Sequence, residues 1–165
     1  LLILQNEVPE PVNLALARWA REQGATVLLN AAPARPMADE FLDQIDILVV
    51  NRVEAAMLAG IPVDTLADAA KAASKLKGET RDVIVTLGGD GLLLRLRNGA
   101  EITVLAEKVK VVSTHGAGDS FIGALAAKLS AGATLEAATR HASRLAGYFV
   151  SLSEEEKEAA DLASQ

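Results

Sequence analysis

The chain has 165 residues and a formal net charge of −6, with 22 acidic and 16 basic side chains. So acidic a chain offers no general basic surface for a phosphate backbone, and we expect no nucleic-acid partner. Half of the residues are apolar but only 3% are aromatic, so Leu, Val, Ile and Ala must form the core. It contains no cysteine, which excludes disulfides and thiolate metal sites and agrees with a cytoplasmic location. The apolar runs are shorter than a membrane span, so no membrane partner is expected.

The first part of the chain predicts short apolar strands that alternate with helices. Pro9 and Pro11 suit the first turn of a helix, and Gly24 and Gly60 suit helix ends. Trp19 is expected on the buried side of the first helix. The expected strands cover residues 1–5, 26–30 and 45–50, and the expected helices cover about 9–23, 38–44 and 52–59.

The rest of the chain predicts one more helix and strand, a hairpin, and then a helical end. Asp64 or Thr65 can cap the helix, and Asn98-Gly99 is a strong hairpin signal. The expected strands cover 83–87, 91–96, 101–105 and 108–112, and the expected helices cover 64–77, 118–130, 135–150 and an acidic segment from 153.

Short apolar strands joined by amphipathic helices indicate an α/β fold. We expect a three-layer, mostly parallel sheet with helices on both faces and one antiparallel hairpin. No linker or repeat divides the sequence, so residues 1–165 are predicted to form a single domain. The apolar run 1–4 at the start would normally follow other residues, and we therefore expect the chain to be part of a longer one.

Three polar or glycine-rich groups follow predicted strands, where ligands bind in such sheets. The first, residues 113–121, opens a helix and contains Gly116, Ala117, Gly118 and Asp119. Backbone N–H groups at a helix start can bind an anion, and a carboxylate beside them can accept a hydroxyl proton. This pattern suits phosphoryl transfer, but a glycine turn followed by an ordinary acid in a first helical turn is an equal reading of the glycines alone.

The second group is Asn51 to Glu54. Asn51 can hydrogen-bond phosphate oxygens, and Glu54 can hold a hydrated Mg²⁺. Taken alone, these two residues more often form an N-cap and a capping box. The third group contains Thr86, Gly88 and Gly91, whose glycines would let a nucleotide lie against the backbone. By itself this group favours a tight turn between two strands.

Taken in order, the three groups resemble the ribokinase-like (PfkB) family of carbohydrate kinases. Members carry N-x-x-E, then T-L-G-x-x-G, then D-T-x-G-A-G-D-x-F; the counterparts here are residues 51–54, 86–91 and 113–121. Residues 1–9 and 29–34 are also similar to family sequences, so the resemblance covers nearly the whole chain.

The resemblance implies transfer of the γ-phosphate of ATP to a sugar hydroxyl, with Mg²⁺. Asp119 matches the catalytic base, and Gly116, Ala117 and Gly118 match the anion hole. Asn51 and Glu54 match the phosphate and Mg²⁺ positions. The nucleotide turn is matched by Thr86, Gly88 and Gly91, and Ser143 aligns with an asparagine that often lies near the adenine.

The chain also departs from the family pattern. Ser113 stands where members have an aspartate that helps bind a monovalent cation, so potassium activation is not implied. The family's N-terminal sugar-binding half and its lid, through which many members dimerise, have no counterpart in the sequence, and a homodimer remains open. We expect the chain alone to be inactive in transfer. The alternative is a truncated or pseudo-kinase module that binds nucleotide without catalysis.

Overall fold

The structure, a computed structural model, describes residues 1–153 and 155–157. Its described part divides into two compact units, residues 1–105 and residues from 106 onward. The prediction of one domain stays a prediction.

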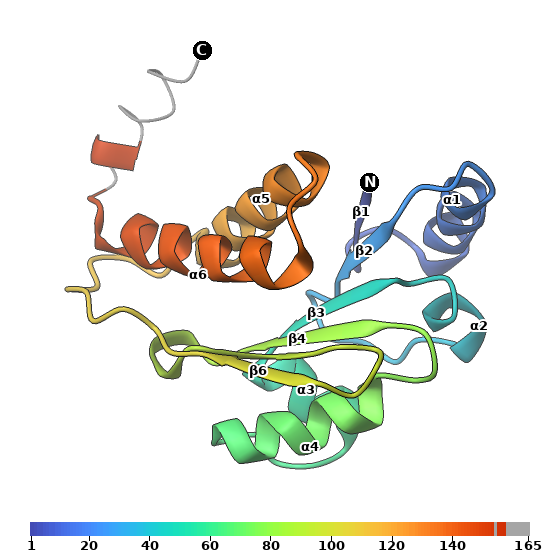
Figure 1. Ribbon diagram of the computed structural model, residues 1–165, viewed down its shortest axis with the longest axis horizontal. Helices are drawn as coiled ribbons and strands as arrows, with labels where there is room; N and C mark the ends of the chain where they lie inside the picture. The colour runs from blue at the N-terminus through green and yellow to red at the C-terminus, as the bar shows by residue number, and fades with distance from the viewer. Residues whose placement is uncertain (154, 158–165) are drawn as a thin grey trace. The chain divides into compact units, whose positions relative to one another are not determined.

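The first unit contains a six-stranded sheet whose strands follow one another in chain order (Figure 1). The first four strands are parallel and the last three form two antiparallel pairs, which confirms a mostly parallel sheet with an antiparallel hairpin. The strands are β1 (Leu2–Gln5), β2 (Val27–Asn30), β3 (Ile47–Asn51), β4 (Asp82–Thr86), β5 (Leu92–Arg95) and β6 (Glu101–Val104).

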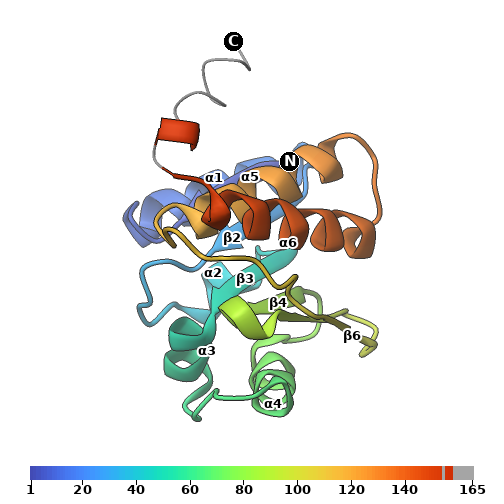
Figure 2. The same ribbon diagram turned by 90° about the vertical axis from the view of Figure 1, so that its left-hand side faces the viewer.

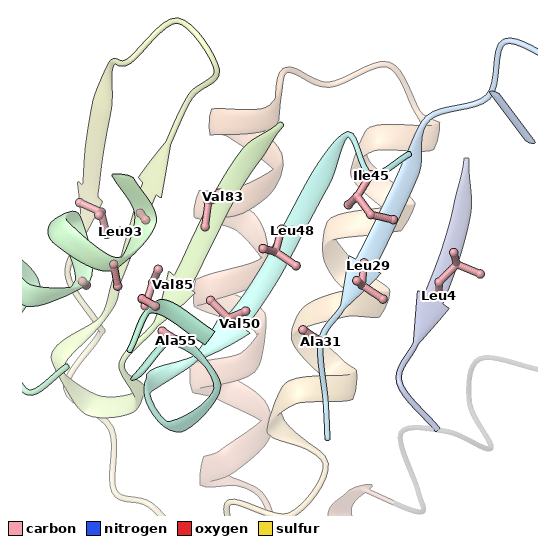
Figure 3. Packing of buried hydrophobic residues seen from close by; sticks show 14 of the residues in the cluster. Leu4, Leu29, Ala31, Ile45, Leu48, Val50, Ala55, Val83, Val85 and Leu93 are labelled. Atoms are coloured by element: carbon pink, nitrogen blue, oxygen red, sulfur yellow. The ribbon is translucent and has the colours of Figure 1, made fainter. Parts of the chain in front are cut away.

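Four helices of this unit pack on one face of the sheet. They are α1 (Glu10–Glu22), α2 (Asp39–Leu42), α3 (Arg52–Ala59) and α4 (Leu66–Leu76). Alternate strand residues such as Leu29, Leu48 and Val50 form one buried cluster with helix residues such as Ala55 (Figure 3). Many of the helix residues are alanines, so the helices can approach the sheet closely. Figure 2 shows α3 and α4 as neighbours below β4.

The second unit consists of an irregular segment and two packed helices, α5 (Ala117–Ser130) and α6 (Leu135–Ser151). The prediction of a strand at 108–112 is wrong, because these residues pair with no strand. The amide of Val112 instead donates to the carbonyl of Val150, near the end of α6. The alternation of apolar and charged residues there was typical of a strand, but a strand also needs a neighbour to pair with.

Trp19 is also not in the core: 60% of it is exposed. Helix α1 buries only the narrow face that carries Asn13, Ala17 and Ala20, and Trp19 lies off that face. The segment predicted as an acidic final helix from residue 153 is helical over residues 155–157, residue 153 itself is not helical, and residues 154 and 158–165 lie outside the described part of the chain. Among the helices that the structure describes, none has the length and apolar character needed to cross a membrane.

Candidate functional site

The first predicted group forms the entry into α5. Gly116 is the N-cap residue and has a left-handed backbone, with φ of 76°. An added Cβ there would lie 3.2 Å from the ring of Phe149, so the position requires glycine for both its backbone and its space. The hydroxyl of Ser113 accepts a hydrogen bond from the amide of His115 at 3.3 Å and shapes the approach to the helix.

The first turn of α5 leaves two backbone donors free. The amide of Ala117 donates to the carbonyl of Thr114, and that of Ser120 donates to the carbonyl of Gly116. The amides of Gly118 and Asp119 have no acceptor among the residues that the structure describes. An added Cβ on Gly118 would contact nothing within 4 Å, so no protein atom crowds the Cα of this residue. Two free amides at the positive end of a helix dipole suit an oxyanion.

The second predicted group forms a complete capping box at the start of α3. The side-chain oxygen of Asn51 accepts from the amides of Val53 and Glu54, at 2.9 and 3.0 Å. The carboxylate of Glu54 accepts from the backbone amide and the side-chain amide of Asn51, both at 2.8 Å. The local reading of these residues is therefore confirmed. The capping box does not use all of their hydrogen-bonding groups, because Asn51 keeps one side-chain N–H and each carboxylate oxygen of Glu54 keeps a lone pair.

Glu54 is the buried acid of this group, with 5% of the residue exposed. Burial raises the pKa of its carboxyl above the ordinary value of 4.5, and the two hydrogen bonds from Asn51 offset part of that effect. No three acidic or histidine side chains gather into a metal site within the described part of the chain. A single carboxylate with hydrogen-bonded oxygens fits a hydrated Mg²⁺ that takes its other ligands from water and phosphate.

The third predicted group forms the turn between β4 and β5, as its local reading predicted. A short 3₁₀ segment, η1 (Gly88–Asp90), lies between Leu87 and Gly91, which flank it as its two cap residues. Gly88 and Gly91 have φ of 60° and 94°, which other residues rarely adopt. The amide of Leu87 donates to the carbonyl of Gly91 at 2.8 Å and closes the turn.

The structure brings the second and third groups together at the same edge of the sheet. Asn51 and Thr86 end β3 and β4 and are paired in register. A residue that the sequence reasoning missed joins them further: the guanidinium of Arg52 donates to the carbonyl of Leu87 at 3.1 Å and to Asp90 at 2.5 Å. The x positions of N-x-x-E gave no signal for this contact.

The remaining predicted site residues lie in the second unit. Gly116 to Asp119 begin α5, and Asp119 is exposed. Ser143 is half-buried on α6. Each unit thus carries its own part of the predicted set.

A cavity of about 460 Å³ in the first unit is separate from all of these residues. Its polar walls include Lys75 and Arg81. Lys75 donates to the carbonyl of Ala59 at 3.1 Å, and Arg81 forms an ion pair with Asp43 at 3.5 Å. Both cations are therefore engaged by the protein itself, and the cavity adds nothing to the predicted site.

Comparison with known proteins gives a family match over most of the chain. The model of the family described as "pfkB family carbohydrate kinase" matches residues 3–156. The ribokinase of Schizosaccharomyces pombe is 42% identical over 142 residues, which is 82% of this chain and 44% of that protein. The deoxyribokinase of Salmonella typhi is 37% identical over 153 residues, which is 91% of this chain and 49% of that protein.

Solved structures agree with the sequence comparisons. The structure of Arabidopsis thaliana ribokinase complexed with ribose and ATP superposes with a TM-score of 0.84 at 31% identity, covering 91% of this chain and 49% of that one. Ribokinase from Thermotoga maritima gives a TM-score of 0.77 at 32% identity, with 95% and 55% covered. The chain therefore spans about half the length of the proteins that it matches.

Proposed function

The chain belongs to the pfkB family of carbohydrate kinases, and we propose that it carries the ATP site and the catalytic base of a sugar kinase. The reaction is transfer of the γ-phosphate of ATP to a sugar hydroxyl. The observation that carries the proposal is the pair of free amides, on Gly118 and Asp119, at the start of α5 beside a carboxylate.

In this proposal the start of α5 binds the phosphoryl group. The free amides of Gly118 and Asp119 donate to its oxygens, and the helix dipole adds to the attraction. Gly116 allows the left-handed entry into the helix, and Ala117 is the first residue of the helix. Preorganised donors of this kind stabilise the charge that builds up on the transferring group.

Asp119 is the proposed catalytic base. Its side chain is exposed in the first turn of α5, one residue after the free amide of Gly118. A carboxylate beside the phosphoryl site can accept the proton of the attacking hydroxyl as the new P–O bond forms.

The nucleotide is proposed to contact the first unit through the turn that holds Thr86, Gly88 and Gly91, with Ser143 as a contact from α6. The free N–H of Asn51 would donate to a phosphate oxygen. Glu54 would hold a hydrated Mg²⁺, whose charge neutralises the phosphates. The capping box supports these two roles because it holds both side chains in place before any ligand binds.

The testing experiment is calorimetric titration with Mg·ATP of two matched variants, Gly118→Leu and Gly123→Leu. Both glycines lie in α5, and an added Cβ at either would contact nothing within 4 Å, so neither variant should clash with the protein. The new side chain at position 118 would stand on the residue that carries one of the free amides, in the first turn of α5, whereas the one at position 123 would lie in a later turn of the helix. We expect saturable binding that is lost in Gly118→Leu and kept in Gly123→Leu. Equal binding by both variants would contradict a phosphate site at the start of α5.

A second candidate is nucleotide binding without catalysis. Ser113 favours it, because its hydroxyl stands where the family pattern has an aspartate and already accepts from the amide of His115. The two candidates differ in turnover. Phosphorylation of a sugar such as ribose that is abolished by Asp119→Asn supports the kinase, whereas nucleotide binding with no transfer to any sugar supports the second candidate.

A further inference from the structure

Arg52 occupies the first position of α3, where a cation is locally unfavourable. The start of a helix carries the positive end of its dipole, and acidic side chains are preferred there, as Glu54 illustrates. The guanidinium of Arg52 has no acidic partner within its own helix but reaches two other segments of the first unit. Its position is therefore explained by tertiary contacts and not by helix formation.

Arg52 contacts two residues of the turn between β4 and β5 and one residue of a neighbouring loop. One terminal nitrogen donates to the carbonyl of Leu87 at 3.1 Å and to the carboxylate of Asp90 at 2.5 Å. The other donates to the carbonyl of Asp64 at 3.0 Å, in the loop before α4. Leu87 begins the turn and Asp90 lies within it, where the amide of Asp90 also donates to the carbonyl of Leu87.

A turn of this composition needs stabilising contacts from residues outside it. Three of its residues, Gly88, Gly89 and Gly91, are glycines, which lose the most conformational freedom on folding. The planar fork of an arginine can hold several acceptors in fixed directions, whereas a lysine is a single flexible point charge. The side chain is only partly exposed (36%), so its carbonyl contacts are sheltered from full competition by water.

We propose that Arg52 is a positioning residue that holds the turn at residues 87–91 in the shape required for nucleotide binding. This inference rests on the proposed function. Arg52 contacts the turn, and in this proposal it acts on nucleotide binding through the turn. Arg52 also links the N-x-x-E segment to the turn, because it lies between Asn51 and Glu54 in the capped start of α3.

The test compares Arg52→Met and Arg52→Lys with the control Arg18→Met. Arg18 forms an exposed ion pair with Glu40, on α1 and α2, away from the turn. Hydrogen exchange measured by NMR reports the amides of Asp90 and Gly91, which are bonded inside the turn. We expect exchange there to become about tenfold faster in Arg52→Met, less so in Arg52→Lys, and unchanged in Arg18→Met. The amides of β2 should keep their rates in all three variants.

The same proteins are then titrated with Mg·ATP. We expect the Kd to rise about tenfold in Arg52→Met and by a smaller factor in Arg52→Lys. Unchanged exchange in both Arg52 variants, or equal acceleration in Arg18→Met, would overturn the role of Arg52 in ordering the turn. Faster exchange with an unchanged Kd would overturn its role in nucleotide binding. If Arg52→Met does not fold, Arg52→Lys decides alone.

No binding of Mg·ATP by the unmodified chain would overturn the proposed function and, with it, the nucleotide role of Arg52. The exchange rates in the turn would still show whether Arg52 orders it. The two failures are thus separate.

Discussion

Replacing Gly116 with alanine should destabilise the second unit by an amount that the backbone predicts. A residue with a side chain costs about 1–2 kcal/mol in the left-handed region, and Gly116 has φ of 76°. The new Cβ would also lie 3.2 Å from Cε1 and 3.4 Å from Cζ of Phe149, which adds about 0.5 kcal/mol if the half-buried ring shifts slightly off its rotamer. The sum is about 2 kcal/mol, or a fall in Tm of about 4–8 °C for a chain of this size.

The assay is thermal and urea unfolding followed by far-UV circular dichroism. Gly123→Ala is the matched control, because Gly123 lies in the middle of α5, is exposed, and has no atom within 4 Å of an added Cβ. It should stabilise the helix by about 0.5–1 kcal/mol. Gly116→Asn should cost less than Gly116→Ala, since asparagine tolerates the left-handed region better.

Adding Phe149→Leu separates the two causes. If the ring contact contributes only about 0.5 kcal/mol, the loss of stability caused by Gly116→Ala should be nearly the same in a Phe149→Leu background. A Gly116→Ala protein as stable as the unmodified chain would refute the reasoning, because neither the left-handed backbone nor the close ring would then have a cost.

Four further outcomes can be measured. In a protein that contains this chain and phosphorylates a sugar, Asp119→Asn should abolish the phosphorylation while changing the Kd for Mg·ATP little; normal turnover would exclude Asp119 as the base. Burial holds the pKa of Glu54 in the folded chain above 4.5, so its ionisation lowers the free energy of unfolding as the pH rises from 4.5 through the raised pKa. The stability of the unmodified chain relative to Glu54→Gln should therefore fall as the pH rises through this range, and an opposite trend would contradict the buried environment. Arg97→Met should cost about 1–3 kcal/mol in urea unfolding, because Asp82 is nearly buried and would lose its ion pair at 2.8 Å; no change would mean that water replaces Arg97 freely. Phe41→Ala should cost about 3–5 kcal/mol, because Phe41 is fully buried, and a smaller loss would indicate that the cavity collapses.

Features that depend on neighbours in the chain were predictable from the sequence. Helix α3 has the predicted bounds because its signals are local: Asn51 and Glu54 close a capping box, and Gly60 ends the helix in a left-handed conformation. Thr65 caps α4 as expected, and the hairpin surrounds Asn98-Gly99. The order of the three motif groups likewise sufficed to indicate the family, to which the family match over residues 3–156 assigns the chain.

Features that depend on contacts between distant segments were decided only by the tertiary structure. The segment 108–112 has the alternation of a strand but pairs with no other strand. Trp19 has an apolar side chain, but it lies on a face of α1 that is not buried. Arg52 looks like an unremarkable residue in N-x-x-E until folding brings Leu87 and Asp90 within reach. The physical reason is the same in each case. Caps and turns are satisfied by residues a few positions away, whereas strand pairing, burial and a bridging guanidinium depend on which segments the fold places side by side.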